Sequence, residues 1–456
     1  MKSTRRSFLR QTGSLGLMTG AANLAAWSAL AEDRAAADYK ALVCIFLFGG
    51  NDANNMVIPN DAGSYKSYSD VRTSASGIMI PQANLLPMTP PRMSGARFGL
   101  HPSLSGLHQV WLQGRLAVLC NVGTLLEPLT RAAYQNRTGS LPENLFSHSD
   151  QQSQWQSAVS AGQSRTGWGG RVSDSVLVFN GGEPFPMILS LSGSVLYAAS
   201  EKAASLTIPS SGTFGLNGFS NTAASQARLA ALRQLLAVHS GNELVYSAND
   251  VAARSIASAD WITSVLRTNP STLQPLFSGR SDSLNQQLYA VARLIAARDQ
   301  IRLKRQVFFC SLGGFDTHTG QLSSQSTLFT QMSAALKAFY DATVVLGIAE
   351  QVTAFTLSDF GRTFRPSAGQ GSDHGWGSHH FILGGAVRGG DFYGQFPTLA
   401  LDGPDDAGTQ GRWIPSTSVD QYAATLAAWF GLSAADLTRV FPRLGRFPST
   451  NLGFLG

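Results

Sequence analysis

Apolar runs of six to eight residues recur towards both ends of the chain and predict buried strands. The first run, residues 41–48 (ALVCIFLF), ends at a pair of glycines and is typical of a strand that is covered on both faces. Comparable runs at residues 116–122, 307–312 and 352–357 predict three more strands, and a shorter apolar segment lies at 381–385. Such strands are typical of a parallel sheet between two layers of helices.

Segments with helical spacing of apolar residues alternate with these strands. The predicted helices span residues 102–113, 223–238, 249–267, 284–304, 328–346 and 418–430. The stretch 124–219 is rich in Gly, Ser and Asn, with short strands predicted at 176–179 and 186–191. The alternation predicts one α/β domain over residues 38–456, with a doubly wound, mostly parallel sheet and an irregular or helical central insertion at about 160–300.

Residues 1–31 have the pattern of an export signal. Arg5-Arg6 stands just ahead of Phe8 and Leu9 in a pattern that resembles the twin-arginine signal, and a weakly apolar stretch then ends in Ala-Leu-Ala at residues 29–31. We expect cleavage near this point and a periplasmic or secreted protein carried by the twin-arginine export machinery. The alternative is a basic amphipathic or membrane-spanning N-terminus, but the apolar stretch is short and interrupted by polar residues, so no stable membrane anchor is predicted.

Composition and charge exclude two classes of protein. Of the 456 residues, 43% are hydrophobic and 14% charged, which excludes long disordered regions. The net charge of +6 suggests an anionic partner, but the predicted signal carries four basic residues and no acidic one, so 30 basic residues face 28 acidic ones in the rest. No nucleic-acid partner is therefore predicted. The three cysteines lie in apolar stretches and are expected to be inert core thiols.

Acidic residues and histidines gather where three of the predicted strands end. The candidate metal ligands are Asp52, Asp316, His318, Asp359, Asp373, His374, His379 and His380. Any single Asp beside Gly is more often a turn residue. Three strand ends with the same residue types instead predict convergence, because open α/β sheets assemble their sites at one edge. Asp and His suit divalent metals, so we expect two ions, Zn or Mn rather than Mg or Ca.

The order of motifs adds a resemblance to a known family. GGND, FSH, GFDTH, SDFGRT, DHGWGSHHFILGG and SVDQYAATLAAWFGL follow one another as in the exported family called domain of unknown function 1501. That family is in turn similar to the alkaline phosphatase superfamily, which includes sulfatases. The resemblance implies an alkaline phosphatase-like fold in which Asp52 and Asp359 share one metal. Asp316, His318 and one of His374, His379 and His380 would hold the other.

Two further residues are candidates for chemistry at this site. Ser147, in the FSH motif at the start of a helical stretch, is a candidate nucleophile, and its alternative is a helix N-cap; Ser149 is a weaker candidate. Arg362 is placed to bind a phosphate or sulfate oxygen, and its alternative is an ion pair with a neighbouring Asp. Phe360 stands where the superfamily usually has His or Asn, which leaves a ligand missing or supplied by Asp373 and His374.

These observations predict an exported, metal-dependent hydrolase of phosphate or sulfate esters, with a small or polymeric anionic ester as substrate. The alternative is a non-catalytic exported protein of the envelope, associated with a polymer, that retains the fold. Histidines beside aspartates favour the enzyme, whereas Phe360 and the absence of an obvious nucleophile favour the alternative.

Overall fold

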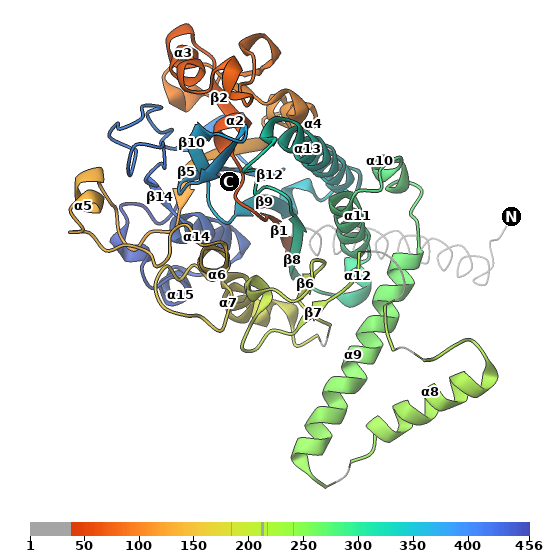
Figure 1. Cartoon of the computed structure of the whole chain (residues 1–456). Coiled ribbons are helices and arrows are strands. Elements are labelled where there is room, and N and C mark those ends of the chain that lie inside the picture. Colours follow the sequence, from red (N-terminus) through yellow and green to blue (C-terminus); the bar gives the residue numbers. More distant parts are fainter. Residues whose placement is uncertain (1–37, 184, 211–213, 217, 240) are drawn as a thin grey trace, which may run out of the picture.

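The computed structural model describes residues 38–183, 185–210, 214–216, 218–239 and 241–456 (Figure 1). The predicted export signal at residues 1–31 and its cleavage point lie outside the described residues. The described chain is a mixed α/β structure around a large, mostly parallel sheet, as the alternation of apolar runs predicts.

The central sheet has the strand order β13-β5-β12-β9-β1-β8-β6-β7, with β14 paired to β5. Its strands are β1 (Lys40–Leu47), β5 (Leu116–Gly123), β6 (Ile188–Ser190), β7 (Ser205–Thr207), β8 (Arg305–Leu312), β9 (Val352–Ser358), β12 (Ser378–Gly384), β13 (Asp391–Gly394) and β14 (Thr417–Ser418). β12 is antiparallel to both of its neighbours, and the other pairings are parallel. The four predicted long strands are confirmed, but β5 is separated from β1 by two strands.

Side chains of β1 alternate between two hydrophobic cores. Val43 and Ile45 belong to the core beneath α4 (Ser105–Leu112), α11 (Ser283–Ala296) and α13 (Gln321–Val345). Cys44 and Phe46 belong to the core on the opposite face, beneath the helices α6 (His148–Ser157), α7 (Trp168–Val176), α14 (Val419–Phe430) and α15 (Ala434–Val440). Figure 1 shows these two groups of helices on either side of the sheet. Burial on both faces explains why the strand is apolar throughout.

Smaller elements complete the body. Two small sheets pair β2 (Val57–Pro59) with β4 (Phe98–Leu100) and β3 (Leu86–Met88), and β10 (Arg362–Ser367) with β11 (Gly371–His374). The short helices are α2 (Ala53–Met56), α3 (Ala62–Val71), α5 (Arg131–Gln135), α10 (Gln274–Phe277) and α12 (Arg298–Ile301). The strand predicted at 176–179 is wrong, because these residues form the end of α7 and the 3₁₀ helix Leu177–Asn180.

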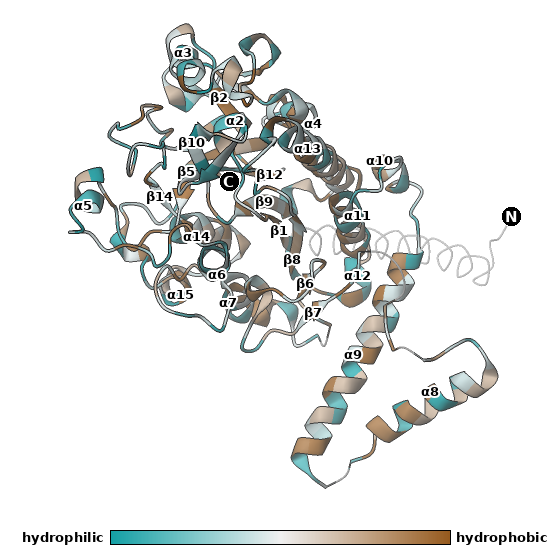
Figure 2. Cartoon of the chain, in the orientation of Figure 1, coloured by the Kyte–Doolittle hydropathy of each residue, from teal (hydrophilic) through white to brown (hydrophobic). Residues whose placement is uncertain are grey.

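Two helices form an arm that projects from the body. Figure 1 shows α8 (Ala223–Leu236) and the outer part of α9 (Glu243–Arg267) standing clear of the sheet. Figure 2 shows apolar stretches on both helices, and Leu244 and Val251 are 82% and 57% exposed. Within residues 160–300, β6, β7 and α11 belong to the layered body. None of the described helices combines the length and hydropathy needed to cross a membrane.

Candidate metal centre

Three neighbouring parallel strands bring the candidate residues to one edge of the sheet. β1 pairs with β8 on one side and β9 on the other, so the carboxyl ends of all three lie together. Asp316 follows β8, and Asp359 follows β9 directly. The β10–β11 hairpin, which follows Asp359 along the chain, carries His374, and the first turn of α6 carries His148.

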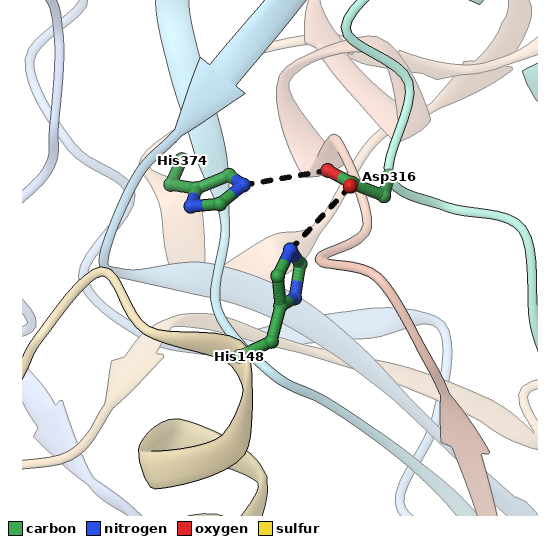
Figure 3. Close-up of side chains that lie close together, drawn as sticks. All are labelled: His148, Asp316 and His374. Carbon is green, nitrogen blue, oxygen red and sulfur yellow. Dashed lines mark ion pairs between the residues drawn. The ribbon is translucent and has the colours of Figure 1, made fainter.

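A cluster of three side chains forms at this edge. His148, Asp316 and His374 each offer one ligand atom, and these atoms lie within 4.8 Å of one another. Figure 3 shows both imidazole rings turned towards the carboxylate. Nε2 of His148 lies 3.5 Å from Oδ2 of Asp316, and Nε2 of His374 lies 3.4 Å from Oδ1. A carboxylate between two imidazoles is a donor set that suits a divalent transition metal.

His318 brings a third imidazole to the same carboxylate. Its Nε2 lies 3.0 Å from Oδ1 of Asp316 and 3.1 Å from Nε2 of His374. His318 is also the more exposed of these two imidazoles, since 43% of its side chain is accessible against 23% for His374. It therefore marks the side on which the cluster opens to solvent.

The other ring nitrogen of each histidine has an oxygen partner. Nδ1 of His148 lies 2.7 Å from Oδ2 of Asp359, and Nδ1 of His318 lies 3.1 Å from Oδ1 of Asp373. Nδ1 of His374 lies 2.8 Å from the Phe146 carbonyl oxygen. These partners assign the proton of a neutral ring to Nδ1, which leaves the Nε2 lone pair facing Asp316. A hydrogen bond of this kind is what orients metal-binding histidines.

Unsatisfied and crowded atoms support the fit of a cation. Nε2 of His148 and Oδ1 of Asp359 are buried without a hydrogen-bond partner in the described chain. The Nε2 atoms of His318 and His374 face each other at 3.1 Å, where two lone pairs repel unless a proton or a cation lies beside them. The residues present therefore fit a divalent metal.

Electrostatics keep the central carboxylate ionised. Burial raises the pKa of Asp316, but the hydrogen bond and charge of Arg362 outweigh this effect and hold that pKa below its usual value. Burial lowers the pKa of His374, which favours the neutral ring needed for metal binding. Burial also raises the pKa of Asp359, and the hydrogen bonds from Gln152 and His148 oppose that rise.

Arg362 lies beneath the cluster rather than facing solvent. It is 1% exposed, and its Nη1 donates to Oδ1 of Asp316 at 2.7 Å. The remaining donors reach the side chain and carbonyl of Ser372. The ion pair with a neighbouring Asp, which was the alternative for this residue, is thus present, and the guanidinium has no side open to a substrate.

The carboxylate of Asp52 bonds to residues outside the cluster. Arg72 binds its carboxylate with two donors, Nη1 to Oδ2 at 2.5 Å and Nη2 to Oδ1 at 3.1 Å. Asn54 donates to Oδ1 as well, and Gln321 donates to Oδ2. Each oxygen already accepts at least two hydrogen bonds, which leaves Asp52 no lone pair for a metal.

His379 and His380 belong to the core of the sheet. The strand that carries them, β12, is buried along its whole length, so neighbouring side chains enter the two opposite cores. Nδ1 of His379 accepts from the Asn121 backbone and its ring stacks on Phe396, while the His380 ring packs on Trp155. Burial lowers the pKa of each to about 3. We leave both out of the proposed ligand set.

Ser147 is the N-cap position of α6, next to His148. Its Oγ donates to Oδ2 of Asp150 at 2.5 Å and lies 3.1 Å from Oγ of Ser149. Ser147 thus occupies the N-cap position, which was the alternative for this residue. Its hydroxyl donates to a side chain, however, and does not cap the helix backbone. No hydrogen bond links Ser147 to Asp316, Asp359 or the described histidines.

His148 is the cluster residue that sequence reasoning missed. It stands between the two serines of the FSHS segment, whose hydroxyl groups were the predicted candidates for chemistry. The available signal was its residue type. A histidine within a motif of a chain that carries aspartates at three strand ends is a candidate metal ligand.

Comparison with known proteins places the chain in a family. The model of a family described as a protein of unknown function, DUF1501, matches residues 39–433. The chain belongs to this family. No curated protein matches it at a significant level.

Three solved structures are similar to this member of DUF1501 at low level. Ps i-CgsB in complex with k-i-k-neocarrahexaose is 9% identical, with 87% of this chain and 73% of that chain covered and a TM-score of 0.32. Ps i-CgsB alone is 10% identical, with 88% and 74% covered and a TM-score of 0.34. The PsFucS1 sulfatase from Pseudoalteromonas sp. is 9% identical, with 92% and 70% covered and a TM-score of 0.31. At these TM-scores, the similarities support no conclusion about activity.

Proposed function

We propose that this DUF1501 protein is an exported, metal-dependent hydrolase of phosphate or sulfate esters. The observation that carries the proposal is the convergence of three imidazole Nε2 atoms on the single carboxylate of Asp316. Export rests on the twin-arginine pattern at residues 1–31, and the ester class rests on the motif resemblance to the alkaline phosphatase superfamily.

The proposed ligands are Asp316, His148, His374 and His318. A set of nitrogen donors with one carboxylate favours Zn or Mn over Mg or Ca, which prefer oxygen donors. We propose one ion at this centre. A second ion, as expected from the sequence, would need Asp52, and Arg72 already supplies the positive charge beside that carboxylate.

Different residues bind the metal, orient the ligands and face the solvent at this centre. Asp316, His148, His374 and His318 would hold a divalent ion, which would supply Lewis-acid polarisation of an ester oxygen and activation of water near neutral pH. Asp359 holds His148 through Nδ1, and Arg362 holds the carboxylate of Asp316 from below. His318 and its partner Asp373, both about half exposed, form the solvent side from which an ester would approach.

Metal analysis and ester hydrolysis test the proposal together. We expect the purified mature protein to hold close to one equivalent of Zn or Mn and to hydrolyse aryl phosphates or aryl sulfates. His148→Ala and Asp316→Ala should lose both metal and activity. His239→Ala is the matched control, because His239 is exposed on the arm, and it should retain both. Bound metal without turnover on any ester would favour the non-catalytic, polymer-associated alternative, and absence of metal would refute the centre itself.

A further inference from the structure

A buried chain of hydrogen bonds leads from Asp316 into the core and ends at Asp52. Arg362 donates from Nη1 to Asp316 and from Nε to Oγ of Ser372 at 3.4 Å. Oγ of Ser372 donates to Oε1 of Gln321, and Nε2 of Gln321 donates to Oδ2 of Asp52. No residue between Asp316 and Asp52 in this chain of contacts is more than 1% exposed. Water therefore does not compete for these bonds.

Asp52 also organises the backbone at Arg362. Asn54 donates from Nδ2 both to Oδ1 of Asp52 and to the Arg362 carbonyl, each at 3.1 Å. Arg72, which is bound to Asp52, donates to the carbonyls of the two residues after Arg362, each at 3.0 Å. The carboxylate of Asp52 thus holds Arg362 twice, by its side chain through Gln321 and by its backbone through Asn54 and Arg72.

We propose that Asp52 and Arg72 are a positioning pair that sets Arg362 and, through it, the metal-binding carboxylate of Asp316. The inference rests on the proposed metal centre and changes the expected role of Asp52 from ligand to support. Partners outside the ligand set tune metal affinity by fixing the ligands in place. Here the hydrogen bonds run from Asp52 through Gln321 and Ser372 before they reach Arg362.

The fixed orientation matters because a guanidinium that loses one acceptor can turn. Among the described residues, Nε of Arg362 donates to Ser372 alone and Nη2 donates to the Ser372 carbonyl. Together with a 3.4 Å bond from Nη1 to the Gly49 carbonyl, these bonds keep Nη1 aimed at Asp316. Removal of the Ser372 hydroxyl leaves Nε without its acceptor and cuts the link to Gln321. It removes no charge, and for this reason Ser372→Ala is the variant that separates positioning from a general loss of folding.

The test is zinc binding by the full mature protein, measured by isothermal titration calorimetry. We expect Ser372→Ala to bind the same number of zinc ions with about tenfold weaker affinity, in line with the effect of other supporting partners. We expect its cobalt complex to show a changed d–d absorption spectrum. Ser333→Ala is the matched control, because Ser333 is another buried serine and lies away from the centre. Its Oγ accepts a hydrogen bond from the backbone N–H of Leu107. The Ser333→Ala variant should bind zinc and cobalt as the unaltered protein does.

A second variant covers the case in which Ser372→Ala is poorly folded by circular dichroism. Gln321→Met keeps the length of the side chain and breaks its links to Ser372 and Asp52, and it should weaken zinc binding to a similar extent. Unchanged zinc affinity and cobalt spectrum in a folded Ser372→Ala or Gln321→Met would overturn the positioning inference while leaving the metal centre intact. Absence of zinc binding in the unaltered protein would instead refute the proposed function.

Discussion

Oδ2 of Asp359 lies 2.7 Å from Nδ1 of His148, and this contact decides which ring nitrogen faces Asp316. The two residues come from opposite halves of the chain, one at the carboxyl end of β9 and the other in the first turn of α6. Gln152, one turn further along α6, donates to the same carboxylate oxygen at 2.8 Å. The helix and the strand end are therefore joined at the point where the proposed metal would bind.

Asp359→Ala should weaken zinc binding about 10- to 100-fold, because His148 loses the partner that fixes its ring. Titration calorimetry of the purified protein measures this change. Asp341→Ala is a suitable control, since Asp341 pairs with Lys337 on α13. Equal zinc affinity in the two variants would show that Asp359 does not support His148.

Arg72→Ala should destabilise the fold strongly. The Arg72–Asp52 pair is fully buried, and loss of one partner from a buried ion pair costs about 3–5 kcal/mol, since the other charge remains without compensation. Urea unfolding followed by circular dichroism measures the difference. Lys66→Ala breaks an exposed pair with Asp70 and should cost less than about 1 kcal/mol. Similar losses in both variants would contradict the importance of the buried pair.

Asp420→Asn should stabilise the protein at neutral and alkaline pH. Burial raises the pKa of Asp420 to about 7, and neither carboxylate oxygen has a hydrogen-bond partner in the described chain. The folded state holds this proton more tightly than the unfolded state, so the native protein loses stability as pH rises from about 4 to 7. The amide should restore roughly 4 kcal/mol at pH 8 and little at pH 4.

Chemical denaturation at the two pH values measures this effect. Asp299→Asn, at a side chain that is 75% exposed, provides a control for removal of a carboxylate elsewhere. A gain that is equal at pH 4 and pH 8 would be inconsistent with ionisation of Asp420 as its cause.

Two valines of α9 should respond differently to the same substitution. Val251 is 57% exposed on the arm, whereas Val265 is 6% exposed where the helix meets the body. Val251→Ala should change the free energy of unfolding by less than about 0.5 kcal/mol, and Val265→Ala should cost about 1–3 kcal/mol. The midpoint of urea unfolding distinguishes them. A large loss at Val251 would mean that the arm is covered by a partner in solution.

Local sequence was sufficient to predict the elements that are buried on both faces. The runs at 41–48, 307–312 and 352–357 became β1, β8 and β9, because a strand between two helical layers needs apolar residues at every position. The irregular middle was harder to predict. The segment at 176–179 is apolar but continues a helix, and a short apolar run does not distinguish a strand from a helical turn.

The sequence by itself determined that Asp316, His318 and Asp359 lie at one edge of the sheet, because parallel strands place their carboxyl ends together. Tertiary structure decided what each side chain does there. Arg72, directly after α3, binds the carboxylate of Asp52, and the first turn of α6 places His148 in the cluster. Residue type and spacing along the chain do not specify such contacts, since these partners meet only when distant segments pack.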